Sequence, residues 1–282
     1  MAAPELLSLV LTLRPLPAAR PAAPIAWWGR AAHQCLLAVV GQADPDLAAA
    51  LHDGEGPRPF TVSSLLGPLR EGFPDPAYTY GLRLTALQEA VAARLLAASE
   101  AGGPLAAGAV LELDRQPFRV EAAVSQGHVW AGATTYAELA AEWLVAPTPA
   151  PRQVGLQFTS PTTFRSQGRH MPVPLPALVF GSLVDRWNAF APLAFPAEVK
   201  RYAEECLAIT RYKLETRSAP VKEGGLRVGA IGQIAYTTLT YDRYWMSILH
   251  VLASFALFAG VGAGTTMGLG QCRAMRREEE GG

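Results

Sequence analysis

The sequence has few of the residues that several common kinds of site require. It contains three cysteines in 282 residues, and Cys35, Cys206 and Cys272 are far apart in the chain. An odd, scattered set supports neither a disulfide framework nor a cysteine-based zinc site, and it fits a reducing, cytoplasmic location. Only three lysines occur, and none follows Lys222. A Walker A loop, which needs Gly-Lys-Ser/Thr, therefore cannot occupy the glycine-rich region near the C-terminus.

Long hydrophobic runs are also scarce. Residues 1–17 have no basic stretch and are not expected to form a signal peptide. The one candidate for a membrane span, residues 248–264, has no formal charge and includes His250, Ser254 and three glycines, and its length is at the short limit for a span. We therefore expect a buried helix here and no membrane association. A membrane-anchored protein is the alternative, and it would depend on this segment alone.

The whole chain has no excess of positive or negative charge, because its formal net charge is 0. The two halves differ, however. Residues 1–149 hold nine Arg against fourteen Asp and Glu, a net of −5, and residues 150–282 hold fifteen Lys and Arg against ten Asp and Glu, a net of +5. The second half therefore has the charge expected of a surface that binds a polyanion.

Glycine, in contrast, is concentrated near the C-terminus, with five residues between positions 260 and 270. Such density indicates tight turns or a close approach to the backbone, and backbone N–H groups in such loops can bind phosphate. A dinucleotide fingerprint does not fit, because Met267 stands where the third glycine is needed and the loop follows a helix. A small-molecule enzyme that binds a nucleotide here is thus an alternative without its usual signature.

Hydrophobic periodicity predicts alternating strands and helices in the first half. Asp44 and Pro45 are expected to begin a short additional helix as its N-cap and first residue. The expected strands are 6–14, 60–65, 78–84, 110–113 and 118–124, and the main helices are 27–40 and 85–98. The order β-α-β-β-α-β is the ferredoxin-like pattern.

The second half repeats this order after a proline-rich segment, residues 146–151, which we interpret as a linker. The expected strands are 154–159, 212–217, 229–239 and 269–275, and the expected helices are 176–190, 198–209 and 241–258. The sequence therefore predicts an α+β protein of two tandem ferredoxin-like (RRM-like) domains, residues 1–146 and 147–282. A single mixed α+β domain is the alternative.

Four segments, in one order along the chain, carry a family pattern. They are Leu51–Ser63, with Leu-His and then Gly-Pro-Arg and Phe-Thr; Phe158–Arg165, with Ser-Pro-Thr; Arg186–Asn188; and the glycine-rich loop with Gly262, Gly264, Gly268 and Gly270. Together they resemble the CRISPR repeat-processing endoribonucleases of the RAMP superfamily. The resemblance implies cleavage of precursor CRISPR RNA within its repeats, without metal or cofactor. It also implies that the glycine-rich loop contacts RNA and that a CRISPR effector complex is a further partner.

The resemblance also indicates a catalytic set, with one departure. Archaeal members pair the motif histidine, here His52, with a tyrosine on the preceding helix and a lysine after Gly-Pro. This chain has Leu37 at the tyrosine position and Arg58 at the lysine position. His33 lies one turn before Leu37 on the same helical face, so it is the candidate replacement. The expected catalytic residues are therefore His52, His33 and Arg58.

Those residue types suit metal-free RNA cleavage. The substrate's 2′-OH attacks the adjacent phosphorus and expels the 5′-oxygen, which leaves a 2′,3′-cyclic phosphate and a 5′-OH. Histidine can serve as the base or the acid because its pKa lies near neutral pH. An arginine can hold the phosphorane oxygens with its planar fork. The sequence leaves open which histidine is the base.

Basic side chains for RNA binding are expected in the second domain. They are Arg165, Arg169, His170, Arg211, Lys213, Arg217, Lys222 and Arg227. Their neighbours Tyr202, Tyr212 and Tyr236 are candidates for stacking on bases. Two questions stay open: a non-cleaving RAMP subunit that holds guide RNA would share the fold and the loop, and the chain could be a monomer or a homodimer.

Overall fold

Strand β1 (Leu6–Pro15) occupies the centre of the first sheet, and its leucines are buried. The computed structural model describes residues 3–18, 24–54, 56–220 and 225–275. The first sheet has the order β2-β5-β1-β7-β6, with β8 also paired to β1. Its other strands are β2 (Phe60–Val62), β5 (Tyr80–Ala86), β6 (Val110–Leu113), β7 (Gln116–Val124) and β8 (Gly132–Thr134). Both long neighbours of β1, β5 and β7, run antiparallel to it.

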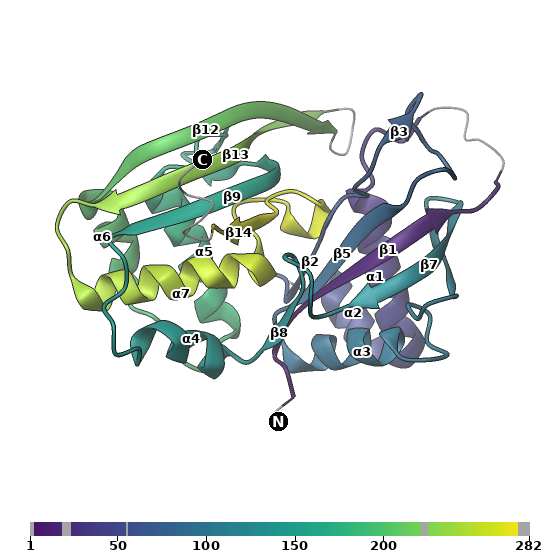
Figure 1. Cartoon of the computed structure of the whole chain (residues 1–282), viewed down its shortest axis with the longest axis horizontal. Coiled ribbons are helices and arrows are strands. Elements are labelled where there is room, and N and C mark those ends of the chain that lie inside the picture. The colour runs from purple at the N-terminus through teal and green to yellow at the C-terminus, as the bar shows by residue number, and fades with distance from the viewer. Residues whose placement is uncertain (1–2, 19–23, 55, 221–224, 276–282) are drawn as a thin grey trace. The chain divides into compact units, whose positions relative to one another are not determined.

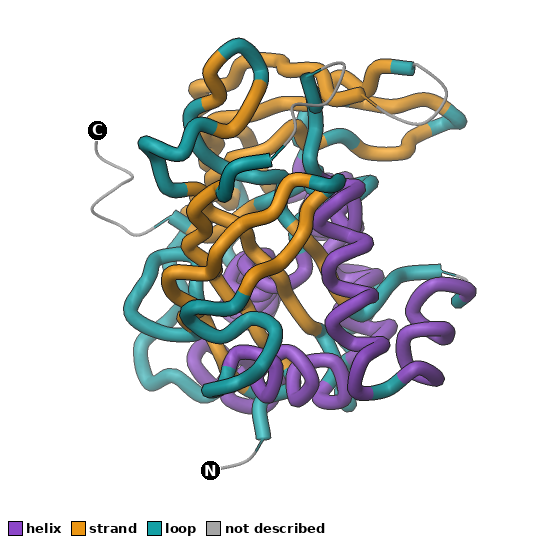
Figure 2. The backbone as a smooth tube through the Cα atoms, turned by 90° about the vertical axis from the view of Figure 1, so that its right-hand side faces the viewer, coloured by secondary structure: helices purple, strands orange, loops and turns teal. Residues whose placement is uncertain are grey.

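Two main helices, α1 (Gly29–Ala43) and α3 (Glu89–Ser99), cover one face of this sheet (Figures 1 and 2). The apolar sides of these helices and of the strands form one core. The short helix α2 (Pro45–Asp53) follows α1, and the carboxylate of Asp44 accepts a hydrogen bond from the Leu47 amide at 3.0 Å, as the sequence predicted. The order β1-α1-β2-β5-α3-β7 is the expected ferredoxin-like pattern.

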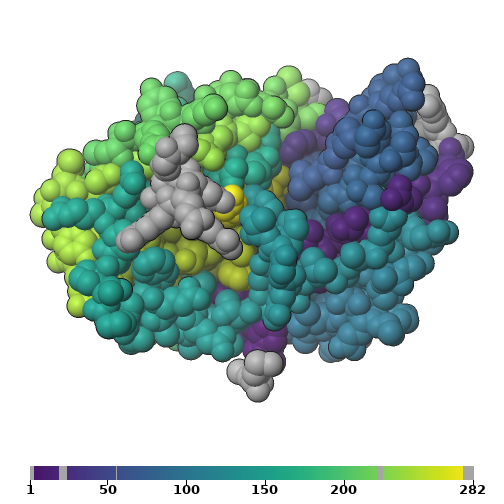
Figure 3. Space-filling model, viewed as in Figure 1, coloured from purple at the N-terminus to yellow at the C-terminus, as the bar shows by residue number. Residues whose placement is uncertain are grey.

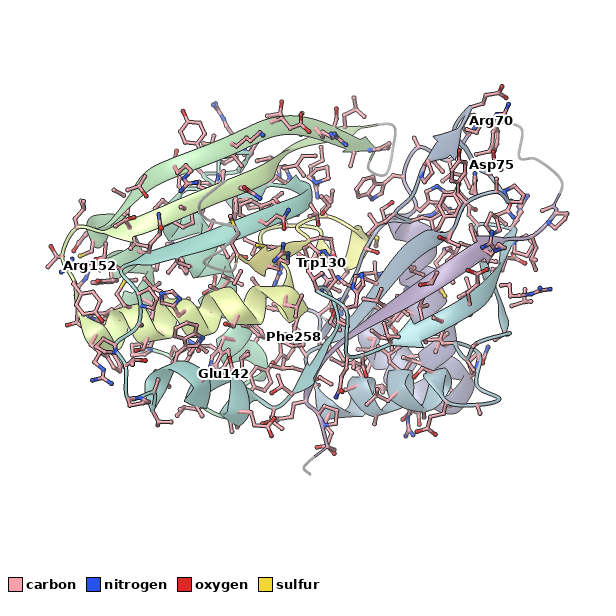
Figure 4. All side chains as sticks on the ribbon, in the orientation of Figure 1. Arg70, Asp75, Trp130, Glu142, Arg152 and Phe258 are labelled. Carbon is pink, nitrogen blue, oxygen red and sulfur yellow. The ribbon has the colours of Figure 1, made fainter. Side chains whose placement is uncertain are left out.

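A small hairpin, which was not among the expected strands, interrupts the connection from β2 to β5. Its strands are β3 (Leu69–Arg70) and β4 (Phe73–Pro74). Arg70 and Asp75 lie together beside it, with 3.8 Å between Nη1 and Oδ2 (Figure 4). The pair is exposed on the arginine side, so we expect it to add little stability.

The second sheet has the order β12-β13-β9-β14 and is antiparallel throughout. Its strands are β9 (Gln153–Thr162), β12 (Leu207–Pro220), β13 (Leu226–Thr238) and β14 (Cys272–Ala274). Counted in chain order within each repeat, the main strands of both sheets follow the order 2-3-1-4. The two halves therefore repeat one topology, and the fold is α+β with tandem ferredoxin-like elements.

Four helices belong to this second half: α4 (Tyr136–Leu144), α5 (Pro176–Phe190), α6 (Glu198–Cys206) and α7 (Arg243–Ala259). Helix α7 contacts both α4 and α5. Their shared core centres on Trp187, whose ring stacks on Phe195 at 4.7 Å and meets Phe255 edge-on at 5.3 Å. Helix α4 was not among the expected helices, and it begins with a capping box formed by Thr135 and Glu138. That Thr-x-x-Glu spacing was readable in the sequence.

A hairpin and a short helical turn complete the second half. The hairpin strands are β10 (Phe164–Ser166) and β11 (Arg169–Met171), and the turn is the 3₁₀ helix η2 (Thr265–Met267). All three cysteines are free. Within the described ranges, no helix combines the length and the apolar character that crossing a membrane requires. The apolar segment that raised that alternative lies mostly in α7, whose side chains are largely buried.

The chain divides into two units, and the division is not a single cut. The first unit comprises residues 1–133 together with Thr266–Gly268, and the second comprises residues 134–265 and 269–282. The expected linker, residues 146–151, lies inside the second unit, after α4. The tripeptide Thr266–Gly268, from the glycine-rich loop, thus belongs to the first unit.

Candidate active site and RNA-binding surface

His33, on the half-buried side of α1, has a defined hydrogen-bond partner. Its Nδ1 lies 3.0 Å from the backbone carbonyl oxygen of Thr266. A carbonyl oxygen can only accept a hydrogen bond, so Nδ1 carries the hydrogen. In the neutral ring, Nε2 then has the free lone pair. The ring also packs against Phe60 at a centroid distance of 5.4 Å, which restrains its orientation.

The surroundings of His33 favour its neutral form. Burial lowers the pKa of His33 below its usual 6.5, and the positive charges of His52 and Arg58 lower it further. The hydrogen bond to Thr266 acts in the opposite direction without reversing the shift. His52 and Arg58 thus act on His33 through their charge, and the contacts of His33 itself are with Thr266 and Phe60.

His52 and Arg58 are held at the C-terminal end of α2. The Nδ1 of His52 donates to the Asp53 carboxylate at 2.8 Å, and the side chain of His52 is 71% exposed. Arg58 Nη2 donates to the carbonyl of His52 at 3.0 Å. Carbonyls in the last turn of a helix lack intrahelical partners and favour a cation. This explains locally why Arg58 folds back onto His52.

The tripeptide Thr266–Gly268 packs closely on the first unit. Trp27 Nε1 donates to the carbonyl of Met267 at 2.7 Å, and Gly268 forms a β-bridge with Ser63. Gly29 leaves the space for this approach, because a Cβ there would lie 1.9 Å from the Met267 oxygen. The sequence analysis missed Trp27 and Gly29, and no local pattern could have identified them, since they lie more than 200 residues from their partners.

In the second unit, Arg186 holds the beginning of the glycine-rich loop. Arg186 is half-buried, and its guanidinium donates to the carbonyls of Ala259 at 2.6 Å, Gly260 at 3.1 Å and Gly262. Burial lowers the pKa of Arg186 to about 10. The amide of Gly262 donates to Ser182 Oγ at 2.9 Å. The Arg-Trp-Asn segment thus has a structural role, which the sequence analysis did not assign.

The four loop glycines selected from the sequence all have positive φ, between 66° and 86°. A Cβ at Gly262 would lie 2.3 Å from the Thr163 oxygen, and one at Gly270 would lie 2.1 Å from the Val261 oxygen. Gly268 and Gly270 are buried, while Gly262 and Gly264 are partly exposed. Positive φ at all four positions, with close packing against the backbone at Gly262, Gly268 and Gly270, therefore accounts for glycine here, whether or not RNA approaches the loop.

Beside this loop, the second unit gathers several of the expected basic side chains. Arg165 and His170 are directly paired across the β10–β11 hairpin, which also carries Arg169. Arg227 lies next to Gly264, since its Nη1 is 3.5 Å from the position that a Cβ on Gly264 would occupy. Burial lowers the pKa of His170, and the charges of Arg227 and Arg165 add to that effect. Mutual repulsion of this kind is typical of a surface that binds an anion.

A second group of basic residues lies along β12, at the edge of the second sheet. Arg211, Lys213 and Arg217 are exposed there, and β12 runs along the molecular surface in green in Figure 3. Arg217 pairs with Glu215 at 3.0 Å, an exposed contact on one strand. Lys222 lies outside the described residues.

Two of the three tyrosines proposed for base stacking are instead part of the core. Tyr236 is 0% exposed and donates its hydroxyl to the Pro174 carbonyl, and Tyr202 is 8% exposed and contacts Thr238. That prediction was wrong for both, because strand alternation and helix periodicity turn their rings inward. Tyr212 is 69% exposed and stays a candidate.

The other histidines have structural environments. His128 accepts a hydrogen bond at Nδ1 from the Trp130 amide, 3.1 Å away, within a turn. His250 is buried in the second unit and stacks on Trp143 at 4.4 Å. The described residues contain no group of three or more His, Cys, Asp or Glu side chains that could hold a metal ion.

Comparisons with known proteins identify related chains. The family model of the CRISPR-associated endoribonuclease Cas6 matches residues 156–272. The curated CRISPR-associated endoribonuclease Cas6 of Mycobacterium tuberculosis is 30% identical over 126 residues, a match that spans 44% of this chain and only 40% of that relative. Among solved structures, a Cas6 (TTHA0078) product complex is 32% identical with a TM-score of 0.73, and the match covers 96% of this chain and 99% of that one. Thermus thermophilus Cas6 (TTHB231) is 27% identical with a TM-score of 0.71, over 98% and 100% of the two chains.

Proposed function

Because the chain belongs to the Cas6 family of CRISPR-associated endoribonucleases, we propose that it cuts precursor CRISPR RNA within the repeats by a metal-independent reaction. The observation that carries this mechanism is the contact between His33 Nδ1 and the Thr266 carbonyl, which leaves the Nε2 lone pair of the neutral ring available; His52 and Arg58 act on this ring through their charge. Each cut leaves a 2′,3′-cyclic phosphate on one RNA end and a 5′-OH on the other, and cutting at successive repeats releases guide RNAs.

His33 is the general base in this mechanism. Its Nε2 takes the proton of the 2′-OH at the cleavage site, and the 2′-oxygen then forms a bond to the adjacent phosphorus. A base must be unprotonated before it acts, and the lowered pKa of His33 keeps the ring neutral near pH 7. A well-placed base of this kind contributes about 10²–10⁴-fold in rate.

His52 is the general acid, and Arg58 stabilises the developing charge. The Asp53 carboxylate occupies His52 Nδ1, so Nε2 of the protonated ring is the nitrogen that can donate to the leaving 5′-oxygen. The bond from phosphorus to that oxygen breaks as the proton is transferred. The remaining donors of Arg58 can bind the equatorial phosphorane oxygens, whose negative charge is greatest in the transition state.

The RNA contacts fall on the second unit and the loop. The hairpin that carries Arg165, Arg169 and His170, with Arg227 and the partly exposed Gly262 and Gly264, supplies a compact cationic surface for phosphates. The β12 residues Arg211, Lys213 and Arg217 extend it, Lys222 is included by sequence alone, and Tyr212 can stack on a base. A contact of RNA with Gly268 and Gly270 would require the buried loop segment to open. Related Cas6 structures are described as a product complex and a substrate mimic complex.

The cellular setting is part of the same proposal. Three free cysteines and the absence of a cysteine pair in contact suit the cytoplasm, where CRISPR transcripts are made. The cut RNA would then pass to a CRISPR effector complex, and the enzyme would act as a monomer or a homodimer. A non-cleaving guide-RNA subunit is not favoured, because the related chains are named as endoribonucleases.

The test is cleavage of a labelled CRISPR repeat RNA in EDTA. Wild type should cut at one position, and a 2′-deoxy group at the scissile nucleotide should abolish the cut. His33→Ala and His52→Ala should each slow single-turnover cleavage by about 10²–10⁴-fold. His128→Ala, which removes a turn histidine of the same unit, is the matched control and should cut normally. Tight binding by wild type without any cut would refute the nuclease assignment, and cutting of the 2′-deoxy substrate would refute the mechanism.

A further inference from the structure

The tripeptide Thr266–Gly268 is a part of the first unit that arrives from the far end of the chain. Three separate contacts hold it there: the Thr266 carbonyl accepts from His33, the Met267 carbonyl accepts from Trp27, and Gly268 bridges Ser63. All of these contacts are made by the backbone of the tripeptide. They therefore depend on where the loop lies and not on the side chains of Thr266 or Met267.

We propose that this tripeptide positions His33, by holding its imidazole in the Nδ1–H tautomer with Nε2 directed to the substrate. The catalytic part of this inference rests on the proposed function, while the tautomer itself does not. The partner of one ring nitrogen decides which nitrogen carries the proton. With the Thr266 carbonyl in place, a hydrogen on Nε2 and a lone pair on Nδ1 would set two acceptors against each other, so that tautomer is disfavoured.

Gly29 makes this contact possible, and it offers a clean way to disturb it. It is the first residue of α1, and it is not among the glycines with positive φ. Alanine is therefore acceptable to the backbone at this position. Its Cβ, however, would stand 1.9 Å from the Met267 oxygen and 2.6 Å from Nε1 of Trp27, the side chain that binds that oxygen, and real atoms do not make such contacts. Gly29→Ala must displace the tripeptide, and with it the Thr266 carbonyl, while every atom of His33 is retained.

Two companion variants separate this effect from general damage. Gly41→Ala makes the same substitution near the other end of α1, where the closest atom is the Ala48 Cβ at 3.3 Å. Trp27→Phe keeps an aromatic ring but removes the hydrogen bond to the Met267 carbonyl. Trp27→Phe should therefore weaken the attachment less than Gly29→Ala does, and Gly41→Ala should leave it intact.

The direct readout is long-range ¹H–¹⁵N NMR of the full-length protein labelled at histidine, which distinguishes the two neutral tautomers. A His33→Ala spectrum assigns the signal. In wild type at neutral pH we expect His33 as the Nδ1–H tautomer. In Gly29→Ala we expect a mixture or the Nε2–H form, whereas Gly41→Ala should match wild type. An Nε2–H tautomer in wild type, or an unchanged His33 signal in a folded Gly29→Ala protein, would overturn the inference.

The catalytic consequence is measured separately, with repeat RNA. Displacing a catalytic group by about an ångström can cost 10²-fold, so Gly29→Ala should slow single-turnover cleavage by about that factor. Its Kd for the 2′-deoxy RNA should change by less than about threefold, because no cationic contact is lost. A normal rate in Gly29→Ala with an altered tautomer would show that the tripeptide does not assist catalysis. If wild type cuts no repeat RNA, the proposed function fails, yet the NMR result still decides the tautomer.

Discussion

Arg186→Met should destabilise the second unit, because the Arg186 guanidinium donates to three backbone carbonyls there. Methionine has a similar length and remains apolar, so the main change is the loss of the guanidinium. The carbonyls of Ala259, Gly260 and Gly262 would then lose this partner, and Ala259 and Gly260 are buried residues. Ala259 ends α7, where unpaired carbonyls and the helix dipole both favour a positive charge.

The magnitude follows from two opposing contributions. Hydrogen bonds from a charged donor contribute about 1.5–3 kcal/mol each, so three give roughly 5–9 kcal/mol. Against this, burial lowers the pKa of Arg186 from 12.5 to about 10, which corresponds to roughly 3 kcal/mol of lost hydration at about 1.4 kcal/mol per tenfold change. Since such bonds are not additive, we expect a net loss near the lower end, about 3 kcal/mol. For a unit of this size, that lowers Tm by roughly 6–12 °C.

The assay is thermal and urea unfolding followed by circular dichroism. Arg201→Met is the matched control, because Arg201 lies exposed on α6, and such a surface change should alter stability by less than about 0.5 kcal/mol. Unfolding of Arg186→Met at the same temperature and urea concentration as wild type would refute the reasoning. It would mean that the three carbonyls find water or other donors at no cost.

Three further predictions concern pH, RNA binding and the loop. The cleavage rate should fall as the pH is lowered, with a midpoint below pH 6.5, because the pKa of the base His33 is lowered. Arg58→Ala should move that midpoint to higher pH, because it removes a positive charge that lowers this pKa. Cleavage rates measured from about pH 5 to 8 test both expectations. Arg165→Ala combined with Arg227→Ala should weaken RNA binding and reduce the slope of log Kd against log salt by about two, in filter-binding titrations. Gly270→Ala should lower Tm, because alanine at φ +66° would place a Cβ 2.1 Å from the Val261 oxygen.

Each of these has a control and a contrary outcome. An acid limb above 6.5, or one unmoved by Arg58→Ala, would contradict the electrostatic account of His33. Arg115 is an exposed residue of the first unit, and Arg115→Ala should leave RNA binding unchanged. If Arg115→Ala weakens binding as much as the double variant does, the RNA is bound by general charge and not by the proposed surface. Gly168→Ala has the same kind of backbone, φ +74°, but open space around it. If Gly168→Ala lowers Tm as much as Gly270→Ala does, backbone strain and not packing explains why residue 270 is glycine.

Local sequence patterns specified most of the fold. The alternating residues of β1, the Asp44-Pro45 start of α2 and the range of α5 were all identifiable, because strand alternation, capping and helix periodicity act over a few residues. The repetition of β-α-β-β-α-β then gave the topology of both sheets. The β3–β4 hairpin and α4 were missed, and of these only α4 had a clear local signal, its Thr135-to-Glu138 capping box.

Some residues of the candidate site were likewise identifiable from the sequence, and others depend on the fold. His52 and Arg58 are close in the chain, and the sequence placed them together. His33 was selected from its helical face relative to Leu37, and in the structure the charges of His52 and Arg58 contribute to lowering its pKa. By contrast, the inward orientation of Tyr202 and Tyr236 removed two expected stacking residues, because it depends on which side of each element meets the core.

The sequence by itself determined the two repeated units, the excess of positive charge in the second half and the glycine-rich loop, since each of these is a property of neighbouring residues. The tertiary structure alone decided that the Thr266 carbonyl meets His33, that Gly29 leaves room for Met267, and that Arg186 binds the start of the loop. The physical reason is that a backbone carbonyl is present at every residue. The sequence cannot indicate which carbonyl will accept a given donor until the chain has folded and brought distant segments together.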